Sequence, residues 1–170
     1  MDARTRSWYA AYGRPVPAFS VPKPAADQET IDVQTTILIV DDNDTFVGIV
    51  SRFLRKQPDL DVVGTANSGA EGIKQALELR PQVILLDLVM PELSGLYVLP
   101  RLRQQAPDSA VIVLTLLEGE GYEEAAKDAG ADAFVPKSKL YTDLIPAIRE
   151  GARVASARAR DSIQAPPAVT

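Results

Sequence analysis

The chain contains neither cysteine nor histidine. Without cysteine it cannot form disulfides, zinc–thiolate sites, iron–sulfur clusters or a thiol nucleophile. Without histidine it lacks the usual general base and the usual ligand of transition metals, and it cannot carry a phosphohistidine of its own. Any chemistry must therefore rest on carboxylates, hydroxyls and lysine, and a metal that takes part must be a hard one.

Long apolar runs are also missing. No stretch approaches the length of a membrane span, and the N-terminus has no apolar core of a signal peptide. We therefore expect a cytoplasmic protein without membrane contact. The net charge is −5, and residues 36–150 carry eleven basic and eighteen acidic groups. Because lysine and arginine carry the binding of a DNA backbone, we expect no direct nucleic-acid binding by this chain.

The 170 residues are 46% hydrophobic and 24% charged, which is typical of one globular domain. Residues 1–35 differ from the rest: they hold four of the thirteen prolines and four of the ten aromatic residues, without a helical or strand period. We predict an extended tail there, with docking through its aromatic residues as the alternative. A folded domain is predicted for residues 36–150. Residues 151–170 are predicted to hold the end of the last helix and a C-terminal tail.

Short apolar runs alternate with helical patterns from Thr36 onward. Buried strands are predicted at residues 37–40, 62–63, 83–86, 111–114 and 133–135. Helices are predicted from Phe46 to a stop at Pro58, from a capping box of Ser68 and Glu71, near 96–105, near 121–129, and from about 140 toward 155–160. Five such units predict an α/β fold, a doubly wound parallel sheet with helices on both faces.

Polar side chains stand where four of these strands end: Asp41 with Asp42, Asp87, Thr115 and Lys137. In parallel sheets a ligand binds outside the carboxyl ends of the strands. Three carboxylates at one place repel each other unless a cation lies between them, and oxygen ligands favour Mg²⁺. The lysine and the hydroxyl suit phosphate oxygens. Each residue alone is equally well explained as a cap or turn residue, but their coincidence favours a phosphoryl-handling site.

Four segments resemble the receiver domain of two-component response regulators: ILIVDDN at 37–43, ILLDLVMPELSG at 84–95, VIVLT at 111–115 and GADAFVPKS at 130–138. The resemblance covers about residues 36–150. It implies a flavodoxin-like fold with strand order 2-1-3-4-5 and five helices. The details are closest to the branch whose members usually carry a helix-turn-helix output domain.

The resemblance also implies a phosphorylation site. Asp87 would be the phosphoacceptor. Asp42 and Asp87 would bind Mg²⁺ directly, together with the backbone carbonyl of Val89, and Asp41 would act mainly through water. The phosphoryl group would come from a histidine kinase or a histidine phosphotransfer protein.

The remaining implied residues belong to the switch. Lys137 would pair with the phosphoryl group, Thr115 would be the switch hydroxyl, and Phe134 would change rotamer on activation. These movements would remodel the face of helix 4, strand 5 and helix 5 for a downstream partner or for a homodimer. Two departures from the family pattern stand out. Pro136 precedes the lysine where the family often has a proline after it, and Pro100 is expected to kink or shorten the third helix.

Three functions remain open at this point. The favoured one is a stand-alone receiver that accepts phosphate and signals through its surface. The second is the receiver part of a DNA-binding transcription regulator that lacks its output domain. The third is a Mg²⁺-dependent phosphatase with an aspartyl-phosphate intermediate, suggested by Asp42-Asn43-Asp44 after a strand. Phe46 departs from the phosphatase pattern, and Asp87 would have no role in it.

Overall fold

The computed structural model describes residues 34–91 and 93–164. The tail predicted for residues 1–35 therefore lies outside the described residues, apart from Gln34 and Thr35. Thr35 is already the first residue of a strand. No helix in the described part of the chain combines the length and the apolar composition needed to cross a membrane.

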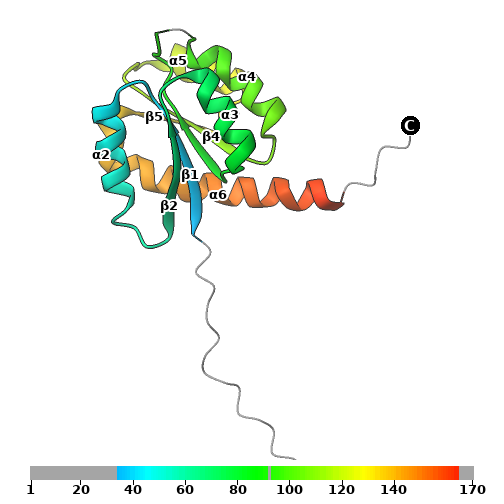
Figure 1. Cartoon of the computed structure of the whole chain (residues 1–170). Coiled ribbons are helices and arrows are strands. Elements are labelled where there is room, and N and C mark those ends of the chain that lie inside the picture. The colour runs from blue at the N-terminus through cyan, green and yellow to red at the C-terminus, as the bar shows by residue number, and fades with distance from the viewer. Residues whose placement is uncertain (1–33, 92, 165–170) are drawn as a thin grey trace, which may run out of the picture. The chain divides into compact units, whose positions relative to one another are not determined.

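The strands form one five-stranded sheet in the order β2-β1-β3-β4-β5 (Figure 1). Their bounds are β1 Thr35–Val40, β2 Leu60–Ala66, β3 Val83–Leu86, β4 Ala110–Thr115 and β5 Ala133–Pro136. Every neighbouring pair is parallel. The predicted fold class and strand order are thereby confirmed. The order reverses between β1 and β3, so the crevice outside their carboxyl ends is the place where this fold binds ligands.

Five α-helices cover the two faces of this sheet. They are α2 Asp44–Leu54, α3 Gly69–Leu79, α4 Gly95–Gln105, α5 Glu120–Asp128 and α6 Leu140–Gln164. The core between the sheet and α2 with α6 contains Ile37 and Ile39, whereas Leu38 and Val40 belong to the core under α3, α4 and α5. Because successive side chains of a strand point to opposite faces, a strand covered on both sides must be apolar throughout. This explains the uninterrupted apolar runs.

β2 is longer than the predicted residues 62–63. It is a strand at the side of the sheet, and its pairing with β1 shifts register between Ile37 and Leu38, where the partner passes from Val62 to Gly64. Such a bulge breaks the alternation of apolar and polar residues from which a strand is recognised. Gly64 is also closely packed: a Cβ there would lie 2.6 Å from Cδ1 of Leu79, so that side chain would have to move.

The helix ends differ from the predicted ones in three places. α2 ends at Leu54, and a turn separates it from Pro58, so the proline does not close the helix. Pro100 lies inside α4 without ending it, and its side chain is exposed. The Ser68 hydroxyl accepts from the Glu71 amide as predicted, but the Glu71 carboxylate accepts from Asn67.

α6 continues to Gln164, beyond the predicted end at 155–160. In Figure 1 it runs behind the strands and continues past them. Its last turns are held by the Arg158 guanidinium, 2.6 Å from a carboxylate oxygen of Asp132, and by the Ser162 hydroxyl, 2.8 Å from Asp108.

Candidate functional site

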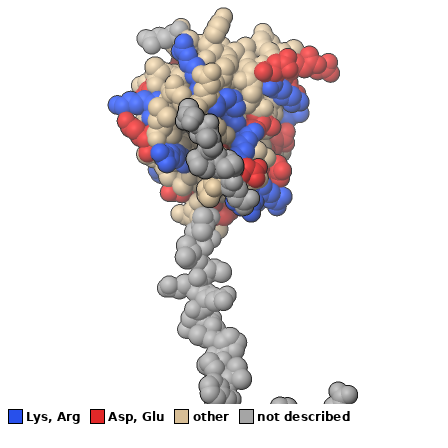
Figure 2. Space-filling view, turned by 90° about the vertical axis from the view of Figure 1, so that its right-hand side faces the viewer, with Lys and Arg blue, Asp and Glu red and all other residues tan. Residues whose placement is uncertain are grey.

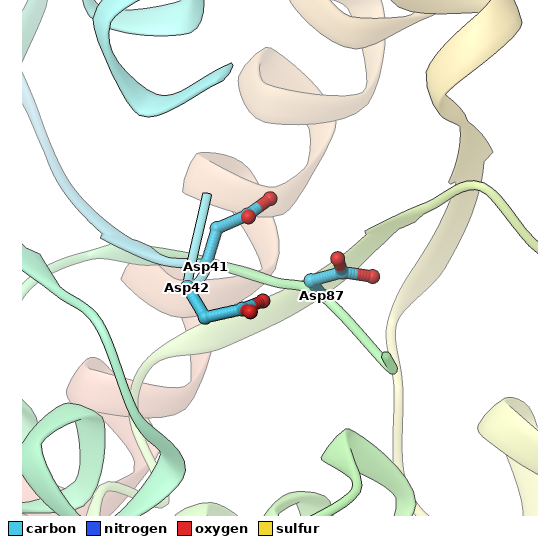
Figure 3. Close-up of side chains that lie close together, drawn as sticks. All are labelled: Asp41, Asp42 and Asp87. Carbon is cyan, nitrogen blue, oxygen red and sulfur yellow. The ribbon is translucent and has the colours of Figure 1, made fainter. Parts of the chain in front are cut away.

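Three aspartates lie together at the carboxyl end of the sheet, which is the end where all five strands finish. Asp41 and Asp42 follow β1, and Asp87 follows the neighbouring strand β3. One carboxylate oxygen from each lies within 4.8 Å of the others. Figure 3 shows the three side chains side by side above the ends of the two strands. The register of the sheet thus brings together residues that are 46 positions apart.

Lys137 binds two of these aspartates. Its Nζ lies 2.6 Å from Oδ2 of Asp41 and 2.8 Å from Oδ2 of Asp87. The exposed fractions of the three side chains are only 6%, 3% and 6%, whereas Asp42 is exposed. One ammonium therefore binds two buried carboxylates, with the exposed Asp42 nearby, so the site has more negative than positive charge.

The backbone orients the two buried carboxylates. Oδ1 of Asp41 accepts from the amide of Asn43 at 2.9 Å, and Oδ1 of Asp87 accepts from the amide of Val89 at 3.1 Å. Aspartate commonly bonds the amide two residues further on in tight turns. In each carboxylate, one oxygen thus accepts a hydrogen bond from the backbone of its own loop and the other accepts one from Lys137. The Val89 side chain is half exposed, so its loop lies at the surface.

Burial raises the pKa of Asp41 above its ordinary value of 3.8, and the charge of Asp87 raises that pKa further. The hydrogen bonds from Lys137 and the Asn43 amide lower the same pKa but do not offset the burial. The ionised form of Asp41 is therefore less favourable at this site than it is in water. A divalent cation with oxygen ligands would supply the missing positive charge, so the residues fit such an ion.

Thr115 and Phe134 lie on neighbouring strands. Thr115 is fully buried, and its hydroxyl accepts from the Leu117 amide at 3.4 Å. Among the described residues that hydroxyl has no hydrogen bond to the aspartates or to Lys137. Phe134 pairs with Val113 on β4 and packs against the core under α3, α4 and α5. The structure thus brings Lys137 into contact with the aspartates and leaves the predicted switch residues outside that contact.

The sequence analysis missed the contact of Phe46. The centre of its ring lies 4.1 Å from Nζ of Lys137. The sequence places Phe46 among the apolar residues of the first helix and as a departure from the phosphatase pattern, without predicting this contact. Its position in the first turn of α2, four residues after Asp42, is the available signal.

Residues 37–149 match the family model for the response regulator receiver domain. The chain belongs to the response regulator receiver family. The chain is 35% identical to the response regulator GacA of Pseudomonas viridiflava over 113 residues. These residues are 66% of this chain and 53% of that protein. The transcriptional regulatory protein LiaR of Bacillus subtilis is 32% identical over 117 residues, 69% of this chain and 56% of that protein. The chain spans about half the length of these curated relatives.

Solved structures agree with the assignment of the receiver domain. The response regulator domain of Thermotoga maritima CheB superposes with a TM-score of 0.65 at 29% identity, covering 71% of this chain and 97% of that one. A DNA-binding response regulator of the LuxR family from Staphylococcus aureus gives 0.64 at 26% identity, covering 69% and 98%. The resemblance found in the sequence motifs, including the branch, is confirmed by these relatives.

Proposed function

We propose that this receiver domain is a phosphorylation-dependent switch whose phosphoacceptor is Asp87. The observation that carries the proposal is the environment of the Asp87 carboxylate: it is buried at the end of β3, hydrogen-bonded to Lys137 and next to two further aspartates. A carboxylate held in place beside a cation can attack phosphorus without having to be oriented first.

Mg²⁺ is the proposed metal. The carboxylates of Asp42 and Asp87 and the backbone carbonyl of Val89 would hold it, with Asp41 acting through water. When bound, the ion neutralises charge on the phosphoryl oxygens. Asp42 is exposed and makes no hydrogen bond to Lys137 among the described residues, which leaves its oxygens available for a metal.

The transfer uses a phosphohistidine of another protein, because this chain has no histidine. An oxygen of Asp87 attacks the phosphorus, and the phosphorus–nitrogen bond breaks with its electron pair going to the departing imidazole. The acyl phosphate that forms carries more negative charge than the carboxylate did. Lys137 then moves its hydrogen bond from the carboxylate to a phosphoryl oxygen. A histidine kinase or a histidine phosphotransfer protein is the proposed donor.

Thr115 and Phe134 are the proposed switch. The Thr115 hydroxyl now accepts from the backbone of its own loop, and this weak contact at 3.4 Å leaves it free to turn toward a phosphoryl oxygen. The half-buried Phe134 ring would then fill the space vacated. The face remodelled by this movement consists of α5, β5 and α6, which are the fourth helix, fifth strand and fifth helix of the prediction. It would bind a downstream partner or a second copy of the chain.

A second candidate is the receiver part of a DNA-binding transcription regulator. It is favoured by the coverage of the curated relatives, of which this chain spans about half. Figure 2 shows basic and acidic side chains interspersed on the face toward which the end of α6 points in Figure 1. Among the described residues drawn on that face, basic side chains form no broad surface for a phosphate backbone. The cytoplasmic location stays a prediction.

The phosphatase alternative requires Asp42 as nucleophile and Asp44 as its partner. Asp44 is an exposed first-turn residue of α2, and the acidic group found among the described residues consists of Asp41, Asp42 and Asp87. This placement favours the receiver function.

The experiment is labelling with acetyl phosphate in the presence of Mg²⁺. Asp87→Asn should take up no label while its circular dichroism stays that of the wild type. Asp42→Asn should be labelled slowly, because a metal ligand is lost. The matched control is Asp44→Asn, which should be labelled like the wild type. Label in Asp87→Asn at the wild-type level would refute the proposed phosphoacceptor, and turnover of a phosphate monoester that depends on Asp44 would favour the phosphatase.

A further inference from the structure

Phe46 belongs to a closed circuit of contacts at the site. The Asn43 amide donates to Oδ1 of Asp41, and Oδ1 of Asn43 accepts from the Phe46 amide at 3.0 Å. The Phe46 ring lies against Nζ of Lys137, and that nitrogen donates back to Oδ2 of Asp41. The backbone of Phe46 is thereby fixed to the same aspartate that Lys137 binds.

The ring itself is also held from behind. Phe46 is partly buried and packs against the core between the sheet and α2 with α6. The side chain of Lys137 is only 6% exposed, so the ammonium and the ring meet with little water between them. Attraction between a cation and the face of an aromatic ring is strongest in such a desolvated place.

The ring differs from the other partners of Lys137 in being neutral. Among the described residues Nζ makes two hydrogen bonds, both to carboxylates. A third carboxylate in the place of the ring would hold the ammonium too, but its charge would repel an incoming phosphoryl group. An aromatic ring attracts the ammonium and leaves its positive charge available for phosphate oxygens.

We propose that Phe46 is a positioning residue for phosphoryl transfer. Its ring keeps the Lys137 ammonium at the site when Asp87, on forming the acyl phosphate, gives up its hydrogen bond to that ammonium. Phe46 would touch neither the phosphoryl group nor the metal and would act through Lys137. This inference rests on the proposed function of Asp87.

Two variants of Phe46 distinguish the effect of the aromatic ring from the effect of apolar packing at this position. Phe46→Leu keeps an apolar side chain in the helix and removes the ring, whereas Phe46→Tyr keeps the ring. The matched control is Phe53→Leu on the same helix: Phe53 is also partly buried, but its ring contacts Tyr141 at a centroid distance of 5.2 Å. We expect Phe46→Leu to slow labelling by acetyl phosphate roughly fivefold and Phe46→Tyr to restore most of the rate. Phe53→Leu should be labelled at the wild-type rate.

The deciding readout is a double-mutant cycle with Lys137→Met. If the ring acts through the ammonium, Phe46→Leu should change the labelling rate of the Lys137→Met protein by less than about twofold. In the unphosphorylated wild type, the NMR signals of the Lys137 ε-methylene should be shifted by the ring current, and Phe46→Leu should remove that shift while Phe53→Leu keeps it.

An equal slowing by Phe46→Leu in both backgrounds would overturn the inference, and so would an unchanged Lys137 methylene shift. Labelling of Phe46→Leu at the wild-type rate would also overturn it, while leaving Asp87 as phosphoacceptor. If the wild-type protein takes up no label, both the proposed function and the positioning role of Phe46 are refuted. The Lys137 methylene shift would then show only whether the ring contacts the lysine.

Discussion

Ion pairs lie at both ends of the sheet: one lysine binds two carboxylates at one end, and one carboxylate binds two arginines at the other. At the carboxyl end, Lys137 binds two buried aspartates. At the amino end, where the strands begin, Asp132 binds two arginines, Arg103 of α4 at 3.2 Å and Arg158 of α6 at 2.6 Å. The first group has surplus negative charge and the second surplus positive charge.

The amino-end group is completed by the backbone. The Asp132 carboxylate also accepts from the Val111 amide, and both arginines donate to the carbonyl of Ser109. Hydrogen bonding to Asp132 raises the pKa of Arg158. Burial lowers the pKa of Arg103, but a guanidinium stays charged at any pH that the fold survives. This end joins α4, the start of β5 and α6 through ion pairs and backbone hydrogen bonds, whereas the carboxyl end has more carboxylates than ammonium groups. The difference suits a structural role for one end and a reactive role for the other.

The largest effect is expected at the amino end. Asp132→Asn should destabilise the domain, because Arg103 and Arg158, which are only partly exposed, lose the carboxylate that they share. Urea unfolding measures it. The matched control is Asp59→Asn, which removes an equally bidentate partner of an α6 arginine, Arg149, at an exposed position. The control should lose far less stability, and equal losses would show that burial does not distinguish the two pairs.

Added Mg²⁺ should act on the carboxyl end alone. At a concentration 100-fold above its dissociation constant it should raise the free energy of unfolding of the wild type by about 2.7 kcal/mol. Asp42→Asn should lose most of this gain, and Asp132→Asn should keep it. A gain that survives Asp42→Asn would mean that the ion binds elsewhere.

Thr115→Ala should separate phosphorylation from its transmission. The variant should accept phosphate, because the hydroxyl is not the nucleophile, and should lose about 1 kcal/mol of stability with its buried hydrogen bond. Amide chemical shifts with and without beryllofluoride should change around Asp87 but not around Phe134. Wild-type shift changes at Phe134 would contradict the assignment of Thr115 as the switch.

The smallest effect concerns the lifetime of the phosphoryl group. Val89 follows Asp87 by two residues and Leu117 follows Thr115 by two residues, and neither apolar side chain can orient a hydrolytic water. The double variant Val89→Asn, Leu117→Glu should lose bound phosphate a few times faster than the wild type in Mg²⁺. Decay at the wild-type rate would show that these two side chains do not determine the lifetime.

The sequence predicted the central strands and the meeting of Asp41, Asp87 and Lys137 well. Strands covered on both faces are apolar throughout, and the carboxyl ends of parallel strands meet at one end of the sheet, so both features follow from local pattern. The bulged strand β2 was underestimated because its register shift at Gly64 interrupts the pattern.

Two features depend on contacts between residues far apart in the chain and could not be predicted from the local sequence pattern. The last turns of α6 are secured by Arg158 on Asp132, which lies 26 positions away. The Phe46 ring meets Lys137 only because the fold brings the first turn of α2 and the residue after β5 to the same end of the sheet. In both cases the pattern shows the residue but not its partner.

The claim that negative charge is in surplus at the carboxyl end is tested most directly by measuring the stability of the Asp41→Asn variant against pH in the absence of metal. Because the pKa of Asp41 is raised in the folded state, ionising it costs stability as the pH rises above 3.8. The stability of Asp41→Asn relative to the wild type should therefore increase as the pH rises above 3.8, measured by urea unfolding in a chelator. A relative stability that stays constant or falls as the pH rises would contradict it.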